Sequence, residues 1–267
     1  MHTAMNKKYT FPFGEQLQKV EQKDKTPKKA FVLGVYASAV HARWVDKNGK
    51  QKVLALAVAS EPNIFWTGEN AAGIIGKINI PKELGTLTVP SNTNLNGPSG
   101  RALDKLYLKP LGLNRQNTWL CDLLPYSRVN LKQREALNKN YTSELIETHN
   151  LPIPNIPDFD KAELNSEKRR EEILNELIQS KADTLILLGD EPIRWFLSHY
   201  TNNEYKKLSD FGKSTETYGL KNEITIQGQN YNVIALCHPR QAGRLGTSSA
   251  NWGNLHDAWV KRINNNR

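Results

Sequence analysis

Short, nearly continuous apolar runs alternate with segments of helical periodicity along most of this chain, and that alternation limits what it can fold into. Runs such as FVLGVY (31–36) and TLILLG (184–189) are typical of strands buried on both faces of a sheet. Strand and helix alternate four times, an order that favours parallel strands with helices on both sides. The sequence therefore predicts an α/β fold with three α/β/α layers and a central, mostly parallel four-stranded sheet.

The other elements follow from the same patterns. Apolar runs at 53–59 and 117–126 are further strand candidates, and residues 223–238 predict a hairpin that leads into a last buried strand. A proline-rich stretch at 151–160 predicts an extended linker. Residues 1–30 are polar and basic and predict an arm or a helix, followed by one domain over 31–267. Apolar residues recur at helical spacing over 97–113, 131–150, 166–180 and 251–263.

The balance of charge is strongly basic. The chain of 267 residues has 36 Lys and Arg against 27 Asp and Glu, which gives a formal net charge of +9. An excess of this size favours a polyanionic partner, and nucleic acid is the first candidate. A positive charge spread evenly over the surface for solubility is the alternative that composition leaves open.

Cysteine usage and hydropathy exclude several other classes. Cys121 and Cys237 both lie in apolar runs, which is typical of thiols that fill a reduced, intracellular core. Two thiols are too few for a four-thiolate site, so we expect no metal and no cofactor. The histidines, His41 among them, lack zinc spacing and are interpreted as structural. No run approaches the ~20 apolar residues that span a bilayer. We expect a monomeric, cytoplasmic protein without membrane contact.

Several short motifs occur in a fixed order at the ends of the predicted strands and helices. Together they resemble the motifs of the uracil-DNA glycosylase superfamily, most closely its mismatch-specific and single-strand-selective branches. Each motif is weak by itself, so the resemblance depends on their order and strand context. The motifs are LGVYAS (33–38), EPNIFW (61–66), GPSGRALDKLYLKPLGL (97–113), DLLPY (122–126), LLGDEPIRWFL (187–197) and CHPRQAGRLG (237–246).

This resemblance implies a uracil-DNA-glycosylase-like fold and an enzyme that hydrolyses the N-glycosidic bond of a pyrimidine extruded from DNA. Bond cleavage leaves a cationic sugar and an anionic base, so the site has to stabilise the leaving group and position a water. By resemblance, His238 donates a hydrogen bond to O2 of the departing pyrimidine. The alternative is a loop histidine that caps the preceding strand.

Two segments are candidates for binding DNA. Arg240, Gln241 and Arg244 follow the His-Pro motif, where they would fill the gap left by the extruded nucleotide or grip phosphates. Ser99 and Arg101 stand at the start of a predicted helix, whose free N–H groups could take a phosphate. An ordinary solvated loop is the alternative for the first segment.

An extruded base needs an aromatic side chain to lie on. Phe65 and Trp66 are adjacent in SEPNIFWTGEN, and this polar, glycine-containing loop favours at least one of them facing a pocket. Tyr36 is a further candidate. Adjacent aromatics beside a strand are also common in cores, so packing is the alternative for each of them.

Two positions depart from the superfamily motifs. Tyr36 stands where the first motif has a water-positioning Asn, Asp or Glu, and a phenol with a pKa near ~10 is a poor base, which leaves Ser38 to orient the water. Asp122 stands where the superfamily has an Asn that contacts the base. An ionised carboxylate only accepts hydrogen bonds, which favours a base with an exocyclic amino group over uracil.

Three other roles for Asp122 stay open. It could activate the water itself, or burial could raise its pKa so that it donates as a neutral acid. It could also cap the turn before Pro125.

The resulting prediction is a monofunctional DNA glycosylase that removes a cytosine or a modified cytosine, in base excision repair or in defence against modified foreign DNA. A catalytically silent DNA-binding module of the same fold is the alternative, because Tyr36 replaces the expected acid. An enzyme on free nucleosides is a weaker one, because a small substrate does not need a charge of +9.

Overall fold

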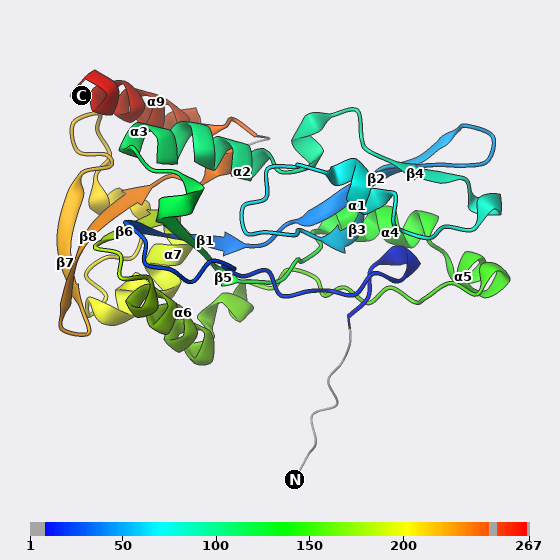
Figure 1. Ribbon diagram of the computed structural model, residues 1–267, viewed down its shortest axis with the longest axis horizontal. Coiled ribbons are helices and arrows are strands. Elements are labelled where there is room, and N and C mark those ends of the chain that lie inside the picture. The colour runs from blue at the N-terminus through cyan, green and yellow to red at the C-terminus, as the bar shows by residue number, and fades with distance from the viewer. Residues whose placement is uncertain (1–8, 246–249, 266–267) are drawn as a thin grey trace, which may run out of the picture.

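The larger of two sheets is mixed and has helices on both sides. In this computed structural model, which describes residues 9–245 and 250–265, four strands of that sheet are parallel and a fifth is antiparallel at one edge (Figure 1). Most residues of the parallel strands are buried, which explains their apolar sequences. In spatial order the strands are β5 (Thr118–Leu124), β1 (Ala30–Tyr36), β6 (Thr184–Leu188), β8 (Gln229–Leu236) and β7 (Lys221–Ile226).

The sheet has one strand more than the four that the sequence predicts. The additional strand is β7, which pairs with β8 in the hairpin expected over 223–238. Gln227 and Gly228 form the turn, with φ angles of 49° and 78°, as a two-residue type I′ turn requires. Because β7 lies at an edge, its buried and exposed residues alternate towards its end, and no continuous apolar run marks it.

The helices that cover the larger sheet fall into two groups (Figure 1). On one face, α2 and α3 are joined by a π-helical segment into the single helical stretch expected over 97–113, and α9 packs against α3. On the other face α6 and α7 contact β1. Their bounds are α2 (Pro98–Leu103), the π-helical segment (Asp104–Leu108), α3 (Lys109–Leu111), α9 (Ala250–Asn265), α6 (Glu167–Ser180) and α7 (Asp190–Trp195).

A second, smaller sheet extends the molecule to one side and was not predicted (Figure 1). Its hairpin of β2 and β3 is antiparallel, and β4 pairs with β2. The apolar run at 53–59 belongs to β3, whereas His41 and Arg43 interrupt the apolar pattern of β2 and conceal it. The strands of this smaller sheet are β2 (Ala39–Val45), β3 (Gln51–Ser60) and β4 (Thr86–Thr88). The helices of this part of the chain are α1 (Ala71–Ile75), α4 (Leu131–Asn140) and α5 (Ser143–His149).

Two other expectations differ from the structure in detail. The helix expected over 131–150 is divided into α4 and α5, because the Thr142 hydroxyl accepts the amide of Leu145 at 3.2 Å and begins a new helix. The described part of the N-terminal segment is extended apart from a 3-10 turn at Pro12–Gly14. It packs onto the protein, because Phe11 and Val20 are buried. Residues 151–160 form neither helix nor strand, apart from an isolated bridge between Asp158 and Val129.

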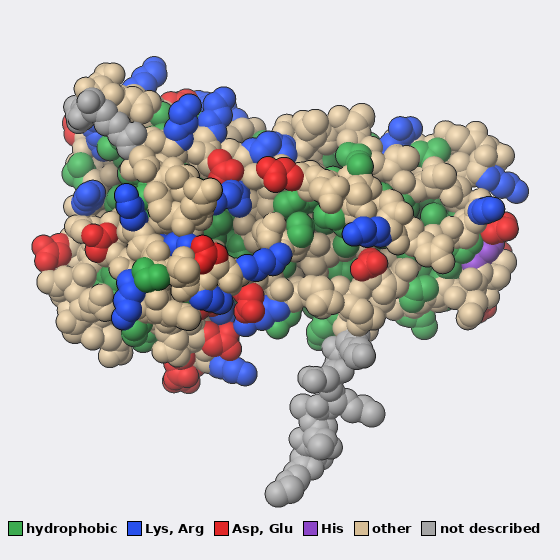
Figure 2. Space-filling view, viewed as in Figure 1, with side chains coloured by type: hydrophobic (Ala, Val, Ile, Leu, Met, Phe, Trp, Pro, Cys, Tyr) green, Lys and Arg blue, Asp and Glu red, His purple; other side chains and the backbone are tan. Residues whose placement is uncertain are grey.

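Basic side chains are spread over the face of the molecule in Figure 2, with acidic ones among them. On this face, therefore, the excess of charge does not form one patch. In the part of the chain that the structure describes, no helix combines the length and the hydropathy needed to cross a bilayer.

Candidate active site

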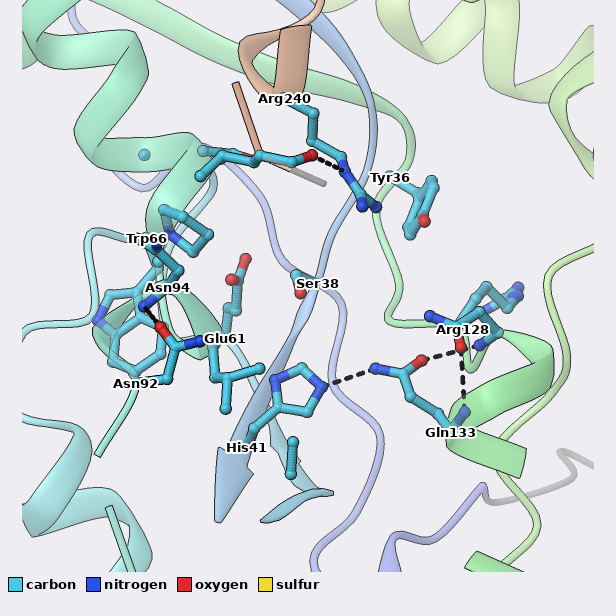
Figure 3. A pocket seen from close by; sticks show the side chains of 18 of the residues that line it. Tyr36, Ser38, His41, Glu61, Trp66, Asn92, Asn94, Arg128, Gln133 and Arg240 are labelled. Atoms are coloured by element: carbon cyan, nitrogen blue, oxygen red, sulfur yellow. Dashed lines mark hydrogen bonds between the residues drawn. The ribbon is translucent and has the colours of Figure 1, made fainter. Parts of the chain in front are cut away.

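A cleft of about 730 Å³ lies where the two sheets meet (Figure 3). Its lining comes from the carboxyl ends of β1 and β5, from strands β2 and β3, from the segments that follow β3 and β8, from the segment before α2, and from the first turns of α2 and α4. The carboxyl ends of parallel strands are where open α/β sheets place their ligands. A volume of this size is typical of a small-molecule or cofactor site and exceeds what one pyrimidine ring fills.

Gly34 lies against two side chains that line the cleft, Asp122 and Phe65. It pairs with Asp122 across β1 and β5, so the Asp122 side chain leans over it. A Cβ atom at position 34 would lie 2.4 Å from Asp122 Oδ1 and 2.5 Å from Phe65 Cζ. Only glycine therefore lets the carboxyl group and the edge of the phenyl ring approach each other above the sheet.

A Gly34→Ala variant is expected to lose this arrangement. The added methyl group has to displace both Asp122 and Phe65, which costs about 1–3 kcal/mol of stability as overpacking does. We expect a lower midpoint in urea unfolding and a loss of any activity that needs the two side chains together. An alanine tolerated without change in either measurement would contradict this account.

Phe65 and Trp66 divide between two cores. Phe65 packs with the core of the larger sheet and Trp66 with that of the smaller, and both side chains also line the cleft. Phe65 has a φ of 50°, and its carbonyl accepts a hydrogen bond from Arg115 at 2.6 Å. Trp66 donates its Nε1–H to the carbonyl of Glu69 at 3.0 Å. The loop is thus held firmly, and the core and cleft roles expected as alternatives coincide.

Glu61 is the residue that the sequence analysis missed. It directly follows β3, is 7% exposed, and faces the cleft from beside Ser38 (Figure 3). Burial, reinforced by the neighbouring Asp122 carboxyl, raises the pKa of Glu61 to about 8, while the Ser38 amide and Arg115 act in the opposite direction. The available signal was an acidic residue at the end of an apolar run within the EPNIFW motif.

Asp122 is the second buried carboxyl group of the cleft. Burial raises its pKa to about 7; Arg169 opposes the rise and Glu176 adds to it. Arg169 lies behind the strand, where its Nη2 donates to the Asp122 carbonyl oxygen at 2.8 Å. Near neutral pH Asp122 therefore exists in both protonation states, which keeps the neutral-acid role open.

The acid pair predicts how stability depends on pH. Because folding raises both pKa values above the ordinary carboxyl range, the folded chain binds more protons than the unfolded chain between about pH 4 and pH 8. The contribution of Glu61 and Asp122 to stability is thus fully present at lower pH and is lost as pH rises through about 7 and 8.

We expect a double variant, Glu61→Gln with Asp122→Asn, to lose less stability than the native chain between about pH 5 and pH 9, by on the order of several kcal/mol. Urea unfolding at both pH values measures this difference. If the free energy of unfolding changes equally with pH in the two proteins, folding does not raise the pKa values of these carboxyl groups.

His238 begins a short helix at the cleft, α8 (Pro239–Ala242). Its Nδ1 accepts the Arg240 amide at 3.2 Å, so the proton of the neutral ring is on Nε2. Burial lowers the pKa of His238 to about 4, with a further contribution from Arg240, and the ring is neutral at pH 7. His238 therefore caps the helix that follows it, whereas the alternative role was a cap of the preceding strand, and it also keeps a ring N–H donor.

The other predicted residues at the first motif lie at the cleft mouth. Tyr36 is 37% exposed, and its ring stacks on Phe159 with centroids 4.8 Å apart. Ser38 is exposed and lines the cleft, and its carbonyl accepts a hydrogen bond from the Ser127 hydroxyl. The stacking partner of Tyr36 is thus a side chain of the protein.

The predicted DNA-binding residues divide into two sets. Ser99, Arg240 and Arg244 line the cleft, and Arg244 is ion-paired with Asp257 at 2.7 Å. Two others are engaged within the protein. The side-chain Oε1 of Gln241 accepts a hydrogen bond from the His238 amide at 3.2 Å, and Arg101 donates to the backbone carbonyls of Thr67, Asn96 and Thr93 at 2.6–2.7 Å.

Arg128 and Lys132 are basic residues of the cleft that were not predicted. Arg128 is paired with Glu163 at 2.8 Å. Within residues 9–245 and 250–265, no group of three or more His, Cys, Asp or Glu side chains is placed to hold a metal ion. A comparison of the sequence with models of known protein families and with curated proteins finds no match.

Proposed function

We propose that this protein is a DNA glycosylase that hydrolyses the N-glycosidic bond of a pyrimidine extruded into the cleft. The observation that carries the proposal is the convergence of two buried carboxyl groups, Glu61 and Asp122, with the Phe65 ring and the His238 donor in one cleft. Base-excising enzymes need a stacking surface, a polar contact to the base and a group that positions water. Each of these is available here.

The proposed chemistry assigns each side chain one task. As the bond between C1′ and the base breaks, negative charge develops on the base and His238 Nε2–H donates to its O2. Glu61, in its ionised form, accepts a proton from the water that attacks C1′. Glu61 would thus perform the water-activating task of the acidic residue that Tyr36 replaces in the first motif.

Asp122 is proposed to select the base. Its ionised form accepts a hydrogen bond from an exocyclic amino group and repels a carbonyl oxygen, which favours cytosine or a modified cytosine. Its protonated form also donates, as the amide of asparagine does, and would then accept uracil. Because burial raises its pKa to about 7, the preference for an amino-bearing base should strengthen as pH rises above that value.

An Asp122→Asn variant tests this selection. Asparagine donates and accepts at every pH, so we expect the ratio of kcat/KM for uracil to that for cytosine to rise by about 10-fold or more, as for one hydrogen bond made in place of a repulsion. A lower rate with an unchanged ratio would instead assign Asp122 to catalysis.

A base-release assay tests the proposal as a whole. Oligonucleotides with uracil, mismatched thymine, cytosine or substituted cytosine are incubated with the protein, and abasic sites are revealed by alkaline cleavage. Abasic sites from at least one pyrimidine are the expected result. DNA binding without product from any substrate would overturn the proposal in favour of a silent binding module.

One observation favours that second candidate. At pH 7 Glu61 is mostly protonated, because burial raises its pKa to about 8, and a protonated acid cannot accept a proton from water. A silent module would still bind DNA with an affinity that falls steeply with salt. The biological role that we propose for the enzyme is base excision repair or defence against modified foreign DNA.

A further inference from the structure

His41 is a buried histidine that lines the cleft away from the residues of the proposed reaction. It lies on β2, is 7% exposed, and occupies the opposite end of the view in Figure 3 from Arg240 and Tyr36. Two hydrogen bonds with Asn96 fix its backbone: the His41 amide donates at 2.8 Å and its carbonyl accepts at 2.9 Å. The strand position of this side chain is therefore well determined.

The first turn of α4 determines where the His41 proton lies. Asn130 and Gln133 form a capping box in which the Asn130 amide donates to Gln133 Oε1 at 2.8 Å. The Gln133 amide group consequently points its NH₂ at His41 Nε2, 2.7 Å away. Nε2 has to accept this hydrogen bond, so the neutral imidazole carries its proton on Nδ1.

Nδ1 is a buried donor without a hydrogen-bond partner among the described residues. Burial lowers the pKa of His41 to about 4, so the ring is neutral. Backbone acceptors at Leu95 and Ala39 act in the opposite direction, but neither lies in hydrogen-bonding geometry with Nδ1. A buried donor left unpaired is costly, and native proteins seldom tolerate one without a reason. The His41 ring belongs to the cleft lining, and Nδ1 itself is covered by its neighbours, so an acceptor atom of a bound ligand would satisfy it after a small shift of the lining side chains.

We propose that His41 Nδ1–H forms a second subsite, which binds an oxygen atom of a substituent carried by the extruded base. This inference rests on the proposed function and narrows its substrate class to bases with an oxygen-bearing group. The cleft of about 730 Å³ leaves space beyond a pyrimidine ring, and the amide side chains of Asn92 and Asn94 line the same cleft. A neutral donor suits a hydroxyl, ether or carbonyl oxygen better than a phosphate, which prefers charged partners.

Matched pairs of substituents test the subsite. Cytosines with a hydroxymethyl, hydroxyethyl or hydroxypropyl group at carbon 5 are compared with ethyl, propyl and butyl analogues of the same size. They are placed in oligonucleotides whose fluorinated sugar resists cleavage, so that affinity is measured apart from chemistry at one fixed salt concentration. At one chain length we expect the hydroxyl compound to bind about 5- to 100-fold more tightly than its alkyl partner.

Two variants separate the subsite from the reaction. His41→Leu should remove the hydroxyl advantage and leave affinity for the alkyl compound within about threefold, because leucine removes the Nδ1–H donor and the hydrogen bond of Nε2 with Gln133 but still offers an apolar surface to the alkyl group. His41→Asn retains an N–H near the position of Nδ1 and should keep part of the advantage. Equal affinities within every pair for the native protein, or an advantage that persists in His41→Leu, would overturn the proposal.

Base release is measured in parallel from unsubstituted cytosine and from the same substituted cytosines on an ordinary deoxyribose. Release of cytosine with equal affinities in every pair would refute the subsite and leave the glycosylase proposal standing. A hydroxyl advantage without release from any substrate would support the subsite and refute the glycosylase. Absence of affinity for every oligonucleotide would refute both.

Discussion

Replacing Glu61 by glutamine is expected to lower the rate of base excision by about 10²- to 10⁴-fold, the usual contribution of a positioned general base. Glutamine has nearly the same shape as the buried, protonated acid but cannot take a proton from water at any pH. Because it also removes a carboxyl group that burial disfavours, the fold should remain intact. Single-turnover rates on the best substrate, together with a urea unfolding curve, measure both effects.

The same residue sets the expected pH profile. Burial and the Asp122 carboxyl raise the pKa of Glu61 to about 8, so its ionised fraction falls tenfold for each pH unit below that value. Excision by the native protein should therefore rise with pH up to about 8 and then level off, whereas the residual rate of Glu61→Gln should not follow this curve.

Glu69 provides a matched control, since it lies in the same loop with an exposed side chain. Glu69→Gln should change neither the rate nor its pH dependence. Native-like excision by Glu61→Gln would show that Glu61 does not activate the water, and Asp122 would become the candidate for that task.

Substituting His238 by alanine is expected to lower kcat by about 10²- to 10³-fold, because it removes a donor that stabilises negative charge on the departing base. The donor acts on charge that appears only as the bond breaks, so the affinity for uncleaved DNA should stay within about threefold. Single-turnover kinetics and equilibrium DNA binding distinguish the two parameters.

Alanine also removes the cap that His238 Nδ1 provides for α8, so capping has to be tested separately. His238→Asn keeps a side-chain acceptor suited to a helix N-terminus but has no group at the position of Nε2. If the Nε2–H donor matters, the asparagine variant should be as inactive as alanine yet more stable. Restored activity in the asparagine variant would assign His238 to capping alone.

The layered core of this protein was predictable from its sequence, because a strand that is buried on both faces of a sheet has a nearly continuous apolar sequence. Residues 31–36 and 184–189 became the adjacent parallel strands β1 and β6, and the closing helix formed where its periodicity placed it. The edge strand β7 and the smaller sheet were harder to predict. Their strands alternate or are interrupted by residues such as His41, and pairing between strands of low local signal is decided by tertiary contacts.

The sequence also identified several residues of the cleft, including Asp122, Phe65 and His238, through the resemblance of its motifs and their position near the ends of buried apolar runs. It could not identify Glu61. That residue becomes a partner of Asp122 only when a loop after the smaller sheet folds against the larger one, and its raised pKa is a property of that burial.

What the sequence by itself determined is therefore the class of fold and the strand ends at which chemistry would lie, since local pattern encodes burial. Only the tertiary structure decided which side chains meet there. Gly34 lets Asp122 and Phe65 come together, and the capping box of α4 places a proton on His41 Nδ1. Protonation state and donor direction depend on neighbours distant in the chain, and no local pattern carries that information.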